Sequence, residues 1–157
     1  MCVNPIYLKD AKQTVRCGKC VECTMTDRKE WFIRLKHEQK YSQSSYFFTL
    51  TYNDNNLPYG EKWPTLSKYD IQKFLKRLRR YNPKHKIRYF AVGEYGEKTK
   101  RPHYHLLIFN IGETQEKAAT AVRKAWTVGE IHVGTVTDAS IQYTTNYMIQ
   151  NMLHSRR

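Results

Sequence analysis

Two histidines and a glutamate are the residues whose types and spacing most directly indicate chemistry. His103 and His105 are two apart in segment 102–109 (PHYHLLIF), whose composition is typical of a strand. Residues two apart in a strand face the same side, with Cα atoms roughly 6.5 Å apart, a spacing at which two imidazoles can meet one metal ion. Glu94 ends the preceding predicted strand, and a hairpin would place it beside His103. These ligands predict a divalent ion with open coordination positions, and the alternative is two surface histidines on an edge strand.

A second candidate feature is a pair of tyrosines near the end of the chain. Tyr143 and Tyr147 are separated by one helical turn, so they share a helix face. At about 100° per residue, the apolar stripe of this helix is centred nearly opposite them and consists of Ile141, Met148, Ile149 and Met152. The tyrosines are therefore either an aromatic pair that packs on a loop or a pair of nucleophiles aimed at a site.

The two features together indicate one reaction. A phenol can attack a phosphodiester and hold the DNA end as a phosphotyrosine, which stores the energy of the broken bond for religation. A divalent ion beside the scissile phosphate would neutralise developing charge and orient the phosphate for in-line attack. The sequence thus contains the parts for nicking and rejoining a nucleic-acid strand.

All four cysteines lie at the start of the chain, at Cys2, Cys17, Cys20 and Cys23. In a cytosolic protein such clustering favours metal binding over disulfides. The spacing of the last three is typical of a chelate, and Cys2 would complete a four-sulfur Zn²⁺ site with a structural role. An iron–sulfur cluster tolerates similar spacing. The remaining alternatives are a site that uses only three of the thiols and free thiols in a flexible tail.

The elements that must position these residues follow from periodicity and turn signals. We expect an irregular segment over residues 1–23, helices over 26–41, 67–80, 114–126 and 138–153, and strands over 46–52, 87–94, 102–109 and 130–136. Ser67 with Asp70 resembles a capping box, and Asp138 is expected to cap the last helix. The order indicates the α+β class, with helices packed on an antiparallel sheet in the ferredoxin-like style.

Composition indicates a nucleic-acid partner. The chain has 157 residues, enough for one domain, and its net charge of +13 comes from 27 basic and 14 acidic residues. Lys98, Lys100 and Arg101 lie in the turn beside the predicted metal site, where they are placed to bind a phosphate backbone. A solvated basic surface is the alternative. Because the sequence shows neither a signal peptide nor a long apolar run, we expect a soluble intracellular protein without membrane contacts.

Three ordered segments carry a family resemblance. YFFTLTYND, RPHYHLLIF and YTTNY resemble the motifs of the His-hydrophobic-His (HUH) replication initiators, most closely those of gokushovirus-type Microviridae phages, and AVGEYG and CGKCVEC are also similar to that subgroup. The resemblance implies a ferredoxin-like or RRM-like HUH endonuclease fold and a catalytic Mn²⁺ or Mg²⁺ ion on Glu94, His103 and His105. It also implies that Tyr143 attacks first and that Tyr147 is the second nucleophile.

The same resemblance implies a biological setting. We expect one HUH endonuclease domain over residues 1–157, with a cysteine-rich segment at 1–25 and a catalytic core at 26–157. Its substrate would be single-stranded DNA at a replication origin in the cytoplasm of a bacterial host, with host helicase or polymerase as further partners. Because initiators of this sort are longer, the chain is expected to be a nuclease part of a larger protein.

One position departs from the family pattern. A lysine usually stands three residues after the first tyrosine, where this chain has Asn146, and the equivalent position after Tyr147 is Gln150. The resemblance implies that this lysine positions the phosphate, so Asn146 is a candidate DNA contact that either takes over this role or changes the activity. It also leaves open which tyrosine attacks first.

Two other functional classes compete with the nuclease prediction. An RRM-like module that binds single-stranded nucleic acid without cutting it would explain the sheet, the charge and the aromatic residues, but it leaves the histidine and tyrosine pairs unexplained. A related HUH transposase or relaxase would share the chemistry. Relaxases usually place the tyrosine before the histidines, and single-tyrosine transposases explain neither the second tyrosine nor the cysteines.

Overall fold

The computed structural model describes the backbone of residues 1–154 and the side chains through residue 148. Its elements are β1 (Ile6–Leu8), β2 (Gln13–Val15), α1 (Val21–Tyr41), β3 (Ser45–Thr51), the short 3₁₀ helix η1 (Asp54–Asn56), α2 (Lys68–Tyr81), β4 (Arg88–Tyr95), β5 (Pro102–Phe109), α3 (Gln115–Ala125), β6 (Ile131–Thr135) and α4 (Asp138–His154). Among these helices, none is long and apolar enough to cross a bilayer.

The main sheet has four strands in the order β4-β5-β3-β6, and every neighbouring pair is antiparallel. Strand β5 lies between β3 and β4, which are joined through α2, so the unit is a split β-α-β arrangement. The expected α+β class and its β-α-β-β-α-β order are confirmed. The predicted edge-strand alternative for the two histidines is wrong, because β5 is an inner strand.

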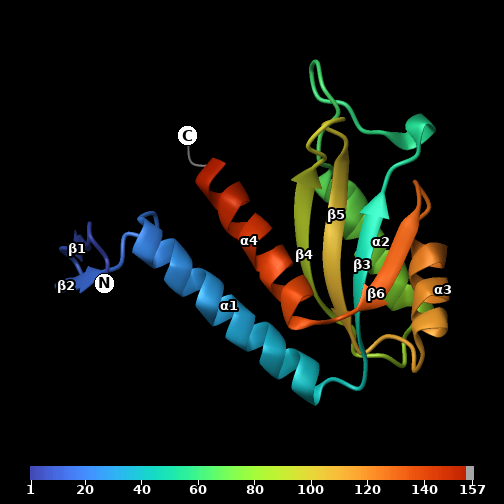
Figure 1. Ribbon diagram of the computed structural model, residues 1–157, viewed down its shortest axis with the longest axis horizontal. Helices are drawn as coiled ribbons and strands as arrows, with labels where there is room; N and C mark the ends of the chain where they lie inside the picture. Colours follow the sequence, from blue (N-terminus) through green and yellow to red (C-terminus); the bar gives the residue numbers. More distant parts are fainter. Residues whose placement is uncertain (155–157) are drawn as a thin grey trace.

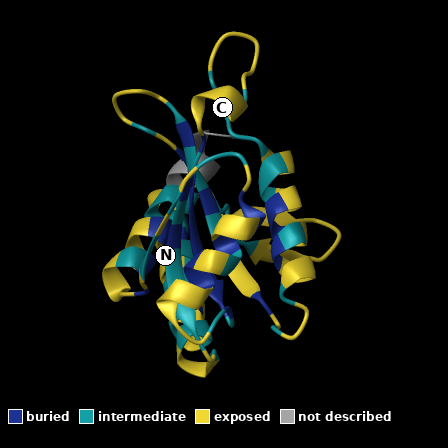
Figure 2. Cartoon of the chain, turned by 90° about the vertical axis from the view of Figure 1, so that its right-hand side faces the viewer, coloured by how far each residue is buried: buried dark blue, intermediate teal, exposed yellow. Residues whose placement is uncertain are grey.

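Helices cover both faces of this sheet (Figure 1). On one face, α2 and α3 bury an apolar cluster against β3 and β5 that includes Phe74, Leu78, Val122, Phe48 and Leu106. On the other face, α1 and α4 pack on a smaller cluster made by Leu35, Ile141, Phe90, Val92, Leu107 and Phe109. Buried positions line the strands, and the outer turns of the helices are exposed (Figure 2).

The alternation of β5 divides its residues between these two faces. Tyr104, Leu106 and Ile108 belong to the cluster beneath α2 and α3, whereas Leu107 and Phe109 belong to the cluster beneath α1 and α4. Because side chains two apart in a strand face the same side, His103 and His105 face α4. The fold therefore directs the histidines toward the helix that carries the tyrosines.

Three local predictions differ from the structure. The N-terminal segment is not irregular throughout, because β1 and β2 form a short antiparallel hairpin. Helix α1 begins at Val21, earlier than expected, and the hydroxyl of Thr26 bonds back to the carbonyl of Glu22 within it. Asp138 is the first residue of α4, and the residue before it caps the helix, since the Thr137 hydroxyl accepts from the amide of Ser140 at 3.2 Å.

Candidate active site and metal centres

The carboxylate and the two imidazoles converge on one point of the sheet. Glu94 of β4 lies directly opposite His103 of β5, as the predicted hairpin requires. The Oε2 atom of Glu94 is 2.9 Å from Nε2 of His105 and 3.4 Å from Nε2 of His103. One ligand atom from each residue lies within 4.8 Å of the other two. The three residues can therefore contact a single ion.

Neighbouring groups fix the orientation of both imidazole rings. The Nδ1 atom of His103 is 3.2 Å from the carbonyl oxygen of Arg101, and Nδ1 of His105 is 3.0 Å from the hydroxyl of Thr49. Phe47 stacks on the His105 ring with 5.6 Å between centroids. A proton on each Nδ1 satisfies these contacts and leaves the Nε2 lone pairs directed at Glu94, the arrangement that metal-binding histidines usually have.

Burial sets the electrostatics of this triad. Glu94 and His105 are 9% and 7% exposed. Burial, together with the nearby His103, lowers the pKa of His105, so the ring is held in the neutral form that binds metals. Two imidazole nitrogens and one carboxylate leave coordination positions open, and this donor set fits a divalent ion that also binds an oxygen ligand.

Tyr143 reaches the triad from α4. Its hydroxyl donates to Oε2 of Glu94 at 3.0 Å and lies 3.5 Å from Nε2 of His105. The Tyr147 ring is 4.7 Å from the Tyr143 ring and 6.4 Å from the His105 ring, centroid to centroid. Burial, followed by hydrogen bonds with Tyr147 and Glu94, raises the pKa of Tyr143, so its phenol stays protonated at neutral pH.

The start of α4 is anchored firmly enough to hold these tyrosines. Ile141 is fully buried between the helices and the sheet, and the Asp138 carboxylate pairs with Nζ of Lys36 on α1 at 2.7 Å. Contrary to a strict separation of faces, Tyr147 also packs against this apolar cluster together with Met148. Of the predicted stripe, the side chains of Ile149 and Met152 lie outside the described residues.

The predicted DNA-binding residues differ in their surroundings. Lys98 and Lys100 are exposed in the β4–β5 turn, close in sequence to the triad. The guanidinium of Arg101 is already engaged, with Asp54 at 2.8 Å and with the carbonyl oxygen of Tyr52 at 3.0 Å. Asn146 is half-buried on α4, between the two tyrosines in sequence. The two lysines are thus the most accessible cations in this turn.

A loop that sequence reasoning treated only as a structure breaker lies beside this turn. Residues 60–65 form a shallow hollow with Tyr95 and Lys100, and the Trp63 side chain in it is 76% exposed. The Tyr95 hydroxyl accepts from the amide of Leu66 at 3.1 Å, which ties the loop to the strand that carries Glu94. The available signal was a tryptophan and a tyrosine within the polar stretch NDNNLPYGEKWP.

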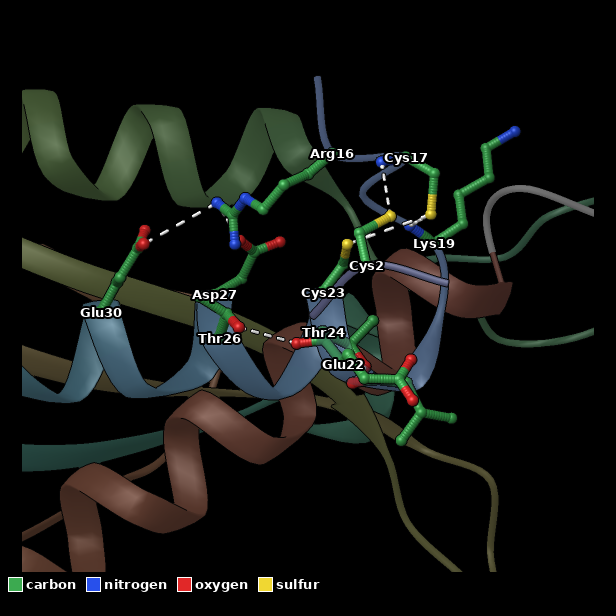
Figure 3. Close-up of polar contacts among 11 residues, drawn as sticks. Cys2, Arg16, Cys17, Lys19, Glu22, Cys23, Thr24, Thr26, Asp27 and Glu30 are labelled. Atoms are coloured by element: carbon green, nitrogen blue, oxygen red, sulfur yellow. Dashed lines mark hydrogen bonds and ion pairs between the residues drawn. The ribbon is translucent and has the colours of Figure 1, made fainter. Parts of the chain in front are cut away.

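The four cysteines also converge, away from the sheet (Figure 3). Two sulfur pairs, Cys17–Cys23 and Cys2–Cys20, are each 3.9 Å apart, far longer than a disulfide bond. Amide hydrogen bonds lower the pKa of Cys2 and Cys17. Burial raises the pKa of Cys23 to about 12, so its thiol ionises at neutral pH only if a cation lies beside it. The cluster is a second candidate metal centre.

Comparison with known proteins identifies the family to which these sites correspond. The family model for the replication-associated protein ORF2 matches residues 45–152. Replication-associated protein VP4 of Bdellovibrio phage phiMH2K is 34% identical over 88% of this chain and 49% of its own length, and replication-associated protein ORF2 of Spiroplasma virus 4 is 32% identical over 96% and 52%. Replication-associated protein ORF4 of Chlamydia phage 1 is 32% identical over 84% of this chain and 37% of the relative. The chain thus spans about half the length of the first two.

A solved structure resembles the fold. The hypothetical protein ORF119 from Sulfolobus islandicus rod-shaped virus 1 superposes with a TM-score of 0.50 over 80% of this chain and 94% of that chain, at 21% identity. At this level of identity the likeness concerns the fold alone. The match to the family model covers all residues of the carboxylate–histidine site and both tyrosines, whereas the four cysteines lie before it.

Proposed function

The chain belongs to the replication-associated protein ORF2 family, and from this premise we propose that it nicks single-stranded DNA at a phage replication origin through a phosphotyrosine intermediate. One observation carries the proposal. The Tyr143 hydroxyl lies 3.0 Å from a carboxylate that also contacts two imidazole nitrogens. A nucleophile that adjoins a divalent-ion site is the arrangement that phosphoryl transfer requires.

The residues divide the work of this reaction. Glu94, His103 and His105 would hold Mn²⁺ or Mg²⁺, which when bound supplies positive charge to the scissile phosphate. Thr49 and the Arg101 carbonyl keep the two imidazoles in the orientation that presents Nε2. The rigid start of α4 holds Tyr143 over the triad, which reduces the entropy cost of bringing nucleophile and phosphate together.

The covalent step is a transesterification. The Tyr143 oxygen forms a bond to phosphorus while the bond from phosphorus to the O3′ leaving group breaks, so the DNA 5′ end is held on the enzyme and a 3′ hydroxyl is released. The phenol proton is balanced by the proton that O3′ gains. Because one phosphodiester replaces another, the step is reversible and the strand can be rejoined.

Tyr147 is placed to act in a second transfer. Its ring lies against Tyr143 but farther from His105, so Tyr143 is the first nucleophile in our assignment and Tyr147 attacks when the displaced strand is resolved. Two nucleophiles that alternate would allow successive rounds of cutting and joining. This division of roles distinguishes the proposal from a single-tyrosine transposase.

The surface beside the triad suits an unpaired strand. Lys98 and Lys100 provide positive charge for phosphates, and Trp63 with Tyr95 provides exposed rings on which bases can stack. Half-buried Asn146 lies between the tyrosines in sequence, where its amide would contact the phosphate in place of the usual lysine. We place this activity in the cytoplasm of the bacterial host, on origin DNA.

The test is formation of a covalent adduct. The chain would be mixed with circular single-stranded phage-type DNA and Mn²⁺, and a denaturant-resistant protein–DNA adduct would be mapped by mass spectrometry. We expect the adduct on Tyr143, its loss in EDTA, and a fall on the order of 10⁴-fold or more in Tyr143→Phe, as for other lost nucleophiles. Tyr147→Phe is the matched control and should retain the first adduct.

Two results would reject the proposal or part of it. Binding of single-stranded DNA without an adduct, across several origin sequences and metals, would identify a non-catalytic binding module. An undiminished adduct in Tyr143→Phe, located on Tyr147, would preserve the nuclease but reverse the order of the nucleophiles.

A further inference from the structure

We propose that Cys2, Cys17, Cys20 and Cys23 bind one Zn²⁺ ion, which fastens the β1–β2 hairpin to the N-terminus of α1. The proposal concerns residues outside the segment matched by the family model and does not depend on the nicking reaction. It rests on the placement of the sulfurs, on the amides that point at them, and on the lack of any apolar core in the segment they enclose.

The sulfur positions are those of a tetrahedron around a single ion. With zinc–sulfur bonds of about 2.3 Å, the sulfurs of a tetrahedral site lie about 3.8 Å apart. Cys17–Cys23 and Cys2–Cys20 are each separated by 3.9 Å. These pairs share no residue, so they correspond to two opposite edges of one tetrahedron. All four sulfurs lie within 4.8 Å of one another, and no oxygen or imidazole ligand is needed to complete the set.

Backbone amides point at the sulfurs as they do at thiolates. The amide of Cys17 donates to Sγ of Cys2 at 3.3 Å, and the amides of Lys19 and Cys20 donate to Sγ of Cys17 at 3.4 Å each. Cys20 is the N-cap of α1 and Cys23 lies in its first turn, where the helix dipole favours negative charge. The loop and the helix start are therefore built to stabilise thiolates.

The enclosed segment lacks another source of stability. Of residues 1–22, none is buried, and β1 and β2 have three residues each. An isolated two-stranded hairpin is marginal in water. The contacts of Arg16 with Asp27 and Glu30, at 3.1 and 3.7 Å, tie the end of the hairpin to α1 but are solvent-exposed ion pairs of small energy (Figure 3). A metal bound by Cys2 and by the other three cysteines would close the loop that contains the hairpin.

Zinc fits this donor set better than an iron–sulfur cluster or a disulfide does. Four thiolates at the corners of one tetrahedron match a closed structural zinc site, which leaves no position for a substrate. An iron–sulfur cluster binds its cysteines through different iron atoms, which would hold the sulfurs farther apart than the observed edges. A disulfide would need a sulfur pair at about 2.05 Å.

The first test measures zinc where the carboxylate–histidine site cannot contribute. The His103→Ala chain would be purified without added metal, and its zinc content determined by mass spectrometry and by release with a thiol-modifying mercurial. We expect one zinc per chain, released as four thiols react. Adding Cys17→Ser or Cys2→Ser should reduce the content to near zero. Full zinc retention in Cys2→Ser would overturn the four-ligand assignment, and its absence from His103→Ala would overturn the site.

The second test remains informative if a cysteine variant folds poorly. Reconstitution of the chelator-treated His103→Ala chain with Co²⁺ should give the intense visible bands and sulfur-to-cobalt charge-transfer absorption of a tetrahedral tetrathiolate. Trypsin should cleave after Lys9 or Lys12 in the hairpin at least about tenfold faster once the metal is removed, because the loop is then free to open. An octahedral cobalt spectrum, or equal cleavage with and without metal, would contradict the proposed clasp.

Discussion

The two clusters of candidate ligands differ in how they are built. The four cysteines come from residues 2–23, present four like ligands and lie around the start of one helix. Glu94, His103 and His105 sit on two adjacent strands of the sheet, and Tyr143 joins them from a helix much later in the chain. One cluster is closed and local, whereas the other is open and depends on the whole fold.

This difference separates the two roles by physical chemistry. A closed tetrathiolate offers no coordination position for a substrate, so its free energy of binding contributes to local order. A three-ligand site on a rigid sheet leaves positions for a phosphate oxygen, and the sheet supplies the precision that chemistry needs. The hairpin and the cysteines lie at the far end of α1 from the sheet (Figure 1), so the two functions are separable by mutation.

The largest separation should come from His103→Ala. Loss of one of three ligands removes most of the ion's contribution to the transition state, several kcal/mol or about 10²- to 10⁴-fold in the rate of adduct formation. The cysteine cluster shares no residue with this site, so zinc content should be unchanged. The paired measurements are adduct yield on origin DNA and zinc per chain. A parallel loss of both would show that one metal population serves the whole molecule.

The sequence was sufficient for the residues whose geometry depends on one element or one hairpin. Two histidines at spacing two on a strand must share a face, and a tight turn must bring Glu94 opposite His103. The capping contact of Ser67 with the amide of Asp70 is local in the same sense and is confirmed at 3.2 Å. The strand order follows from the element order and was anticipated as ferredoxin-like.

Contacts that depend on non-local packing could not be predicted from the sequence. Thr49 meets His105 only because β3 pairs with β5 in a register that nothing near Thr49 specifies. The engagement of Arg101 by Asp54 and the position of Trp63 beside Tyr95 likewise depend on the path of a long loop. The early start of α1 was missed because β-branched and cysteine residues at 21–26 have poor helix propensity.

Thr49→Val should produce an intermediate effect at the open site. The substitution keeps the shape but removes the hydroxyl that lies 3.0 Å from Nδ1 of His105, which frees the ring to change its tautomer and orientation. We expect a 10- to 100-fold weaker apparent affinity for Mn²⁺ in the adduct assay, as is common for lost outer-shell partners. At saturating Mn²⁺ the adduct yield should recover.

Thr49→Ser is the matched control for this position, because it retains a hydroxyl on the same strand. It should keep an affinity for Mn²⁺ close to that of the parent chain. If Thr49→Ser were as impaired as Thr49→Val, packing of the methyl group against the ring would be the cause, and the orienting hydrogen bond would have no role.

Cys2→Ser should have the smallest effect on the reaction. Cys2 precedes the hairpin, and its sulfur contacts Cys17 and Cys20 beside the helix start. Distant and independent sites have nearly additive effects, so the rate of adduct formation at saturating DNA should stay within about twofold of the parent rate. The same variant should lose zinc, which is the reverse of the His103→Ala pattern. If Cys2→Ser instead abolished the adduct while the sheet remained folded by circular dichroism, the N-terminal hairpin would have to reach the DNA, and the closed cluster would then be part of the active site.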